Sequence, residues 1–176
     1  MYEPSIEALS SAALIEARAQ CEAAPRDRRL KLVEHLALEL NRDDFYRLLG
    51  EQWSAFSHLR WHAQFLRDQL RSATEEDLLA MMTTHEAQLR DALPTHFIIY
   101  RGCFHQNVEG LSWCIDRRVA AQYPYTPELW IEEPPLLAAA EVRRRQTVVK
   151  LRPTGLEVIA WKAKVVSVEM LPPTSH

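Results

Sequence analysis

The chain has 176 residues, of which 47% are hydrophobic and 26% charged, so it is long enough for one compact domain with a sizeable core. Its formal net charge of −3 and pI of about 6.2 argue against a general affinity for nucleic acid or acidic membranes. Three cysteines at irregular spacing match no zinc or disulfide framework, and a reducing, cytoplasmic setting is expected. No segment approaches the roughly 18 consecutive apolar residues of a membrane span.

The first half of the sequence predicts helices, because apolar residues recur there at helical spacing. Asp43 or Asp44 is suited to cap one of them, and Ser72 and Glu75 have the spacing of a capping box. We expect an interruption at Gly50 and a helix end before Pro94. The expected helices cover residues 5–23, 28–40, 45–70 and 73–92.

The second half changes to short runs of β-branched and aromatic residues, which are typical of strands. Asp116 is a plausible N-cap for one short helix in this half, and a proline-rich loop follows over 123–135. The sequence therefore predicts an α+β fold, in which a helical region (1–93) packs on a β-rich region (94–176). The expected strands cover residues 96–102, 110–115, 136–144, 147–152 and 156–171.

The sequence offers no metal site. His58 and His62 lie four residues apart on a predicted helix, but two histidines without a third ligand do not make a zinc centre. The aromatic stripe that includes Trp53 and Phe56 is interpreted as core packing. The arginine run 143–145 is interpreted as a solvated surface, so nucleic acid is not expected as a partner.

One constellation does indicate chemistry. Arg101 lies at the end of a predicted strand and precedes Gly102, where a guanidinium can grip a phosphate and a glycine lets a ligand approach the backbone. Ser112 and Trp113 lie on the next predicted strand. Glu157, at the start of an apolar strand, could stabilise a cationic sugar transition state. A structural role, with Arg101 paired to Glu157 or Asp116, is the alternative.

The motifs in this stretch carry a resemblance. Residues 100–102 (Tyr-Arg-Gly), 110–113 (Gly-Leu-Ser-Trp) and 116–120 (Asp-Arg-Arg-Val-Ala) resemble, in this order, a group of uncharacterised phage and prophage proteins. That group is similar to ADP-ribosyltransferases of the Arg-Ser-Glu class, and the resemblance covers roughly residues 45–170. It implies an ADP-ribosyltransferase-like β-rich half that uses NAD as substrate, acts on a host target and needs no metal.

The resemblance also implies roles for single residues. Arg101 would bind the phosphate or ribose of NAD, Ser112 would order the pocket, and Glu157 would hold the ribose as nicotinamide leaves. The residues expected to contact NAD are Tyr100, Arg101, Gly102, Ser112, Trp113 and Tyr123.

Two positions depart from the pattern of that class. Cys114 stands where a threonine or serine is usual, and Gly155 stands where arginine-modifying members carry Glu or Gln. Arginine is therefore not the expected acceptor, and protein side chains, nucleic acid and water stay open. The alternative function is a non-enzymatic phage protein of the same fold that binds and inhibits a bacterial host or defence protein, with Trp130 as a candidate anchor.

Overall fold

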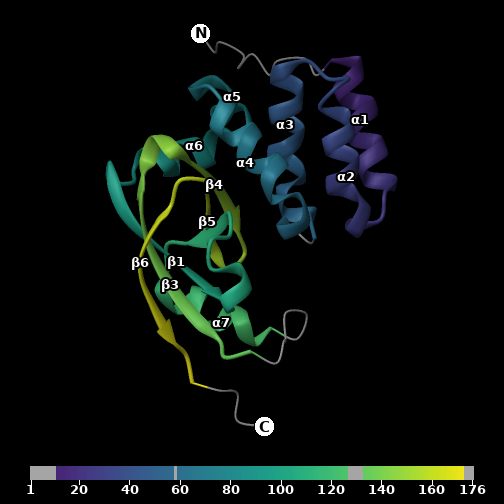
Figure 1. Cartoon of the computed structure of the whole chain (residues 1–176). Helices are drawn as coiled ribbons and strands as arrows, with labels where there is room; N and C mark the ends of the chain where they lie inside the picture. Colours follow the sequence, from purple (N-terminus) through teal and green to yellow (C-terminus); the bar gives the residue numbers. More distant parts are fainter. Residues whose placement is uncertain (1–10, 58, 127–132, 173–176) are drawn as a thin grey trace.

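A computed structural model describes residues 11–57, 59–126 and 133–172. Helices fill the first half of the described chain and strands the second, which confirms the expected α+β class (Figure 1). The helices of the first half are α1 (Ala12–Ala23), α2 (Arg26–Leu36), α3 (Arg42–Gln52), α4 (Ala63–Ser72), α5 (Glu75–Ala80) and α6 (Thr84–Asp91). One further helix, α7 (Arg117–Gln122), lies among the strands, capped by Asp116 as predicted.

The prediction of a single helix over 73–92 is wrong, because the structure divides this segment into α5 and α6. Thr74 caps α5 in a capping box with Asp77, and Thr83 caps α6 in a second box with Glu86. The box expected at Ser72 is therefore also wrong. Each threonine accepts a backbone N–H that a helix start leaves unpaired, so two adjacent caps favour two short helices over one long one.

Gly50 does not interrupt its helix, which is a second correction. Helix α3 runs through it, and a Cβ there would lie 2.1 Å from the carbonyl oxygen of Met81. The glycine therefore lets the segment after α5 approach α3 closely. The chain leaves helical geometry only after Gln52, in the 3-10 turns η1 (Trp53–Ala55) and η2 (Leu59–His62) that lead into α4.

Six strands form one antiparallel sheet in the order β4-β5-β2-β1-β3-β6. The segment 136–143, rich in alanine, is a strand as predicted, and it pairs with β1 over eight residues. Strands β1 and β2, by contrast, share the single register pair Tyr100–Cys114. The strands are β1 (His96–Cys103), β2 (Ser112–Cys114), β3 (Leu136–Arg143), β4 (Thr147–Arg152), β5 (Gly155–Ala160) and β6 (Lys164–Met170).

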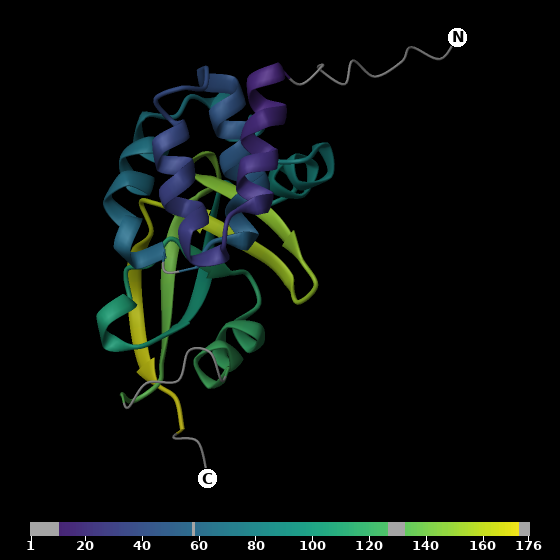
Figure 2. The same ribbon diagram turned by 90° about the vertical axis from the view of Figure 1, so that its right-hand side faces the viewer.

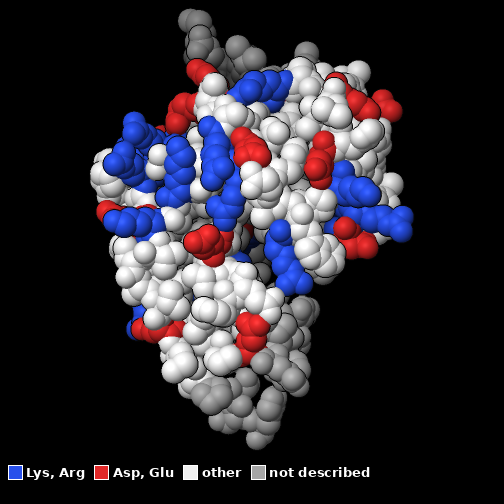
Figure 3. All heavy atoms as spheres, in the orientation of Figure 1, with Lys and Arg blue, Asp and Glu red and all other residues white. Residues whose placement is uncertain are grey.

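The helices of the first half stand over one end of the sheet, and α7 lies near the other end (Figures 1 and 2). Helices α5 and α6 contact β4, whereas α7 contacts β1, β2 and β3. One apolar cluster continues from the helical half into the sheet, with Trp53 and Trp113 among its fully buried members. Figure 3 shows Lys and Arg side chains gathered at the upper left, over the turn that joins β3 to β4 and the start of β6.

Candidate functional site

The sheet brings the three expected catalytic residues onto neighbouring strands. Arg101 lies on β1, Ser112 on β2 and Glu157 on β5, and these strands are adjacent in the order β5-β2-β1. Between β2 and β5 the register pairs Cys114 with Glu157 and Ser112 with Ile159. Ser112 and Glu157 therefore share one face of the sheet, because paired residues and residues two apart point to the same side.

Ser112 and Glu157 meet directly. The Ser112 hydroxyl donates a hydrogen bond to Oε1 of Glu157, and the glutamate side chain is buried, with a residue exposure of 8%. This contact joins residues 45 positions apart, and it forms because β2 and β5 pair. The serine thus holds the carboxylate in one orientation.

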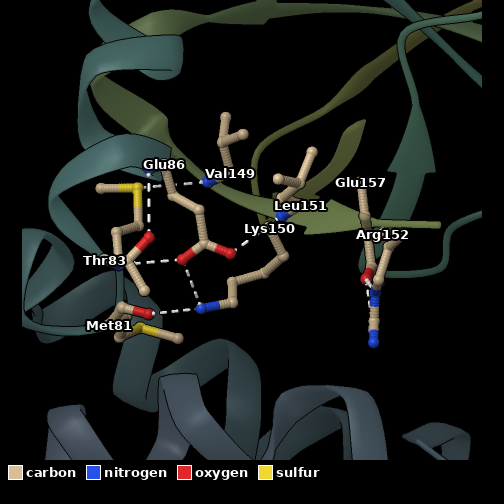
Figure 4. Close-up of polar contacts among 9 residues, drawn as sticks. Met81, Thr83, Glu86, Val149, Lys150, Leu151, Arg152 and Glu157 are labelled. Carbon is tan, nitrogen blue, oxygen red and sulfur yellow. Dashed lines mark hydrogen bonds and ion pairs between the residues drawn. The ribbon is translucent and has the colours of Figure 1, made fainter. Parts of the chain in front are cut away.

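Two residues that the sequence did not assign to the site complete the contacts of Glu157. The indole Nε1 of Trp53 donates to Oε1 at 3.1 Å, and Arg152 binds Oε2 through Nε and a second guanidinium nitrogen (Figure 4). Arg152 could have been found from the hairpin, because the turn joining β4 to β5 places it opposite Gly155. Trp53 lies 104 positions away and gives no local signal beyond the buried aromatic stripe.

Arg101 does not join this group through its side chain. Tyr100 pairs with Cys114 and so shares the face of Glu157, whereas Arg101, one residue further along β1, leaves from the opposite face. Its guanidinium donates to two backbone carbonyls, those of Asn107 at 3.1 Å and of Ser112. Arg101 therefore fastens β2 and the preceding loop to β1, while the charge of Glu157 still acts on its guanidinium.

The Arg101 side chain is buried and fills the space beside Gly110. Burial lowers the pKa of the guanidinium, and no carboxylate of the described residues forms an ion pair with it. A Cβ at Gly110 would lie 2.3 Å from Cζ of Arg101, so Gly110 is small because the arginine occupies that space. Arg101 is thus held by backbone dipoles, and neither alternative ion pair, with Glu157 or with Asp116, forms.

Gly102 and Trp113 have packing roles in this structure. A Cβ at Gly102 would lie 2.0 Å from the carbonyl oxygen of Ala120, so the glycine admits α7 and not a ligand. Trp113 is 1% exposed, and its Nε1 donates to the carbonyl of Gly110 at 2.8 Å. Trp113 therefore belongs to the core and has no face open to a nicotinamide.

The two tyrosines expected to contact NAD differ. Tyr100 is half-buried on the Glu157 face of β1, next to α7. Tyr123 follows α7 and is 50% exposed, so its ring is free to cover a bound molecule. Together with Ser112 and Cys114, which are also half-buried, Tyr100 gives this face polar groups that solvent reaches.

Gly155 has a physical reason to be glycine. Its φ is +126°, a conformation that other residues rarely adopt, and it sits in the turn between β4 and β5. The side chain that the resemblance leads one to expect here would therefore strain the turn. The same turn sets the positions of Arg152 and Glu157, so the departure at Gly155 and the ion pair belong to one local arrangement.

The thiols near the site are not activated. Burial raises the pKa of Cys103, and burial together with the negative charge of Glu157 raises the pKa of Cys114. Both are free cysteines. A thiolate is the nucleophilic form, so neither side chain is suited to act as a nucleophile here.

Trp130, the candidate anchor for a partner, lies outside the described residues. Within the described ranges, no three His, Cys, Asp or Glu side chains are grouped so that they could hold a metal ion. No helix there is both long and apolar enough to cross a bilayer. No protein family model matches the sequence, and neither a curated protein nor a solved structure shows significant similarity to it.

The chemistry open to this group follows from its donors. Among the described residues, Glu157 is a buried acceptor whose hydrogen-bond partners are side chains, and one of these, Arg152, has a side-chain exposure of 26%. A rotation of Arg152 would uncover Oε2 while Ser112 and Trp53 keep Oε1 in place. The arrangement can thus present one oriented carboxylate oxygen to a hydroxyl or to a developing positive charge.

Proposed function

We propose that this chain is an ADP-ribosyltransferase-like protein of the phage and prophage kind, which cleaves NAD and modifies a host target. The observation that carries the proposal is the contact between Ser112 and Glu157 on neighbouring strands, with Arg101 on the third. It supports the serine and glutamate roles that the motifs imply. The proposed setting is the host cytoplasm.

In the proposed reaction, the bond between the ribose and nicotinamide of NAD breaks, and its electron pair leaves with nicotinamide. Arg152 first rotates away from Oε2. Glu157 then accepts a hydrogen bond from a ribose hydroxyl and stabilises the oxocarbenium ion. An acceptor hydroxyl, amine or water then adds to the sugar carbon and loses its proton. Ser112 and Trp53 keep the carboxylate oriented throughout.

Arg101 takes a different role from the one implied by the motifs. Its guanidinium donates to the carbonyls of Asn107 and Ser112, so we assign it as a positioning residue that sets the place of β2. Tyr123, which is exposed beside α7, is the residue best placed to cover bound NAD. The Glu157 face, and not a cleft between Arg101 and Glu157, is the proposed binding surface.

Release of nicotinamide from NAD, measured with the purified protein, tests the proposal. The Glu157→Gln variant keeps a hydrogen-bond acceptor for Ser112 and Trp53 but loses the charge, so it should stay folded and lose the activity. Glu76→Gln, an exposed change of the same chemistry on α5, is the control and should keep full activity. Equal release by wild type and Glu157→Gln would rule out the assigned carboxylate.

A specific observation also favours the second function, binding without catalysis. Both oxygens of Glu157 already accept hydrogen bonds from protein side chains, one of them from Ser112, and Arg101 donates to backbone carbonyls. Glu157, Ser112 and Arg101 therefore also hold neighbouring strands together. If the chain is a non-enzymatic inhibitor, the immobilised wild type and the immobilised Glu157→Gln variant should retain the same host protein equally well. Retention should not need NAD, and no nicotinamide should be released. Retention that depends on NAD would exclude this second function.

A further inference from the structure

A basic hollow lies on the sheet away from Glu157. It is formed where three segments distant in sequence meet, namely the start of β1, the turn from β3 to β4 and the start of β6. The side chains that line this hollow include His96, Glu141, Arg143, Gln146, Lys162 and Lys164. Arg145 lies in the same turn as Gln146 and is exposed.

The strand registers place four of these residues in two neighbouring cross-strand pairs on one face of the sheet. His96 on β1 pairs with Arg143 on β3, and Glu141 on β3 pairs with Lys164 on β6. Arg143 and Glu141 are two residues apart, so all four side chains project from the same face of the sheet. The two pairs together span β1, β3 and β6, and Lys162 and Gln146, which precede β6 and β4, line the same hollow.

The cations of this hollow are not neutralised within the described part of the chain. Arg143, Arg145, Lys162 and Lys164 are exposed and take part in none of the ion pairs found there. Glu141 is the one carboxylate among the lining residues. Figure 3 shows the result as the gathering of Lys and Arg at the upper left. A hollow lined mainly by one sign of charge concentrates the field and attracts an anion.

The turn that carries two of these arginines is held firmly. Nη1 of Arg144 donates to the carbonyls of Asp91 at 2.6 Å and of Leu93 at 2.9 Å, and Thr147 donates to the carbonyl of Arg144 at 2.7 Å. Arg144 thus anchors the turn to the segment after α6, while its neighbours on both sides stay free for a ligand. Cations on a fixed turn lose less conformational freedom on binding.

We propose that this basic hollow binds the phosphodiester backbone of nucleic acid. The three lining cations, Arg145 in the adjoining turn and the Gln146 amide suit several phosphates in succession, and Arg143 can bind one phosphate through two parallel hydrogen bonds. A planar bilayer surface cannot enter a hollow, whereas a phosphate chain can. The proposal goes beyond the NAD chemistry and does not depend on it, and it departs from the expectation that the net charge alone gave.

Fluorescence anisotropy with a labelled 20-nucleotide oligothymidylate, and with a 20-base-pair duplex, tests the proposal across a salt series. Wild type should bind, and its affinity should fall linearly on a log–log plot as salt rises. The double variant Arg143→Gln/Lys164→Gln should reduce the slope for the single strand by about 1.4, which corresponds to roughly 70-fold weaker binding at 50 mM salt.

The chain offers a matched control. Arg28 and Lys31 line another hollow, on α2, so Arg28→Gln/Lys31→Gln makes the same change in net charge elsewhere. This control should bind within twofold of wild type, and both variants should keep the wild-type Tm. An equal loss in both variants, no binding of either probe at 50 mM salt, or binding only to phosphatidylserine vesicles would each overturn the proposal.

Discussion

Two buried glutamates flank β4, one of them structural and the other, Glu157, the proposed catalytic carboxylate (Figure 4). Glu86 is 6% exposed and pairs with Lys150, whereas Glu157 is 8% exposed and pairs with Arg152. The two cations are two residues apart on the same strand. Burial and charge pairing alone therefore do not distinguish the sites.

The donors do distinguish them. Glu86 accepts the backbone N–H groups of Thr83 and Leu151 at 2.9 Å each, in addition to Lys150 at 2.8 Å. Backbone donors cannot rotate away unless the local structure opens, so Glu86 ties α6 to the edge of the sheet. It also accepts the backbone N–H of Leu151 on the edge strand β4, a donor that would otherwise be open to another strand.

Glu157, by contrast, is held by side chains alone, those of Ser112, Trp53 and Arg152. Side-chain donors exchange partners by rotation, without loss of the backbone hydrogen bonds of β5. A carboxylate held in this way can be oriented at rest and still release one oxygen to a ligand. The kind of donor, side chain or backbone, and not burial, therefore distinguishes Glu157 from Glu86.

The largest expected effect is on stability at Glu86. Glu86→Ala leaves the Lys150 ammonium and the Leu151 N–H without their acceptor, and we expect a loss of about 3 kcal/mol in the free energy of unfolding. Urea unfolding measures it. A loss below about 1 kcal/mol would show that the hydrogen bonds of Glu86 do not hold α6 to the edge of the sheet.

Next in size is the turn before Glu157. Gly155→Ala forces a β-carbon onto a residue with φ of +126°, and we expect a loss of about 1–2 kcal/mol together with reduced nicotinamide release. Thr154→Ala, at the exposed neighbour, is the control and should change stability little. An unchanged Gly155→Ala protein would mean that the turn does not fix the place of Glu157.

Acid should act on the Glu86 region. Burial opposes ionisation of Glu86, but hydrogen bonds from Lys150, Thr83 and Leu151 outweigh it and hold its pKa below the usual range. Because the folded pKa is the lower one, this stabilisation is present above about pH 5 and is lost as pH falls towards the folded pKa.

The measurement is urea unfolding at pH 7 and at pH 4, for wild type and for Glu86→Gln. Wild type should lose more stability between the two pH values than the variant does, since the variant has no carboxylate to protonate at this position. Equal pH dependence would assign acid sensitivity to other groups.

The smallest expected change in stability is at Arg152. Its side chain is 26% exposed, and Glu157 keeps two other donors, so Arg152→Gln should change the free energy of unfolding by about 1 kcal/mol or less. The same change should strengthen NAD binding, because one oxygen of Glu157 becomes available. A loss above about 2 kcal/mol would place Arg152 with the structural contacts of Glu86.

Some of this arrangement could be predicted from the sequence. The strand that carries Arg101, the helix capped by Asp116 and the strand rich in alanine follow from short-range patterns, and the structure confirms them. The side of the sheet from which Arg101 leaves could not be predicted, because it depends on the register of β1 against β2 and β5. A shift of one residue would have placed it beside Glu157.

Long-range contacts account for most of the rest. The sequence 83–86, Thr-Thr-His-Glu, carries a capping-box signal that divides the expected helix. Its glutamate also accepts a backbone N–H of β4, and this contact arises only when the chain folds. Trp53 was expected in the core and lies there, yet its indole N–H reaches a carboxylate 104 residues away. Such contacts leave no periodic pattern in the sequence.

The most direct test is an experimental structure of the protein with NAD bound. We predict that Arg152 has left Oε2 of Glu157, that a ribose hydroxyl occupies its place, and that Ser112 and Trp53 still donate to Oε1. The Glu86–Lys150 contacts should be unchanged in the same structure. NAD bound elsewhere, with the Arg152–Glu157 pair intact, would contradict the account.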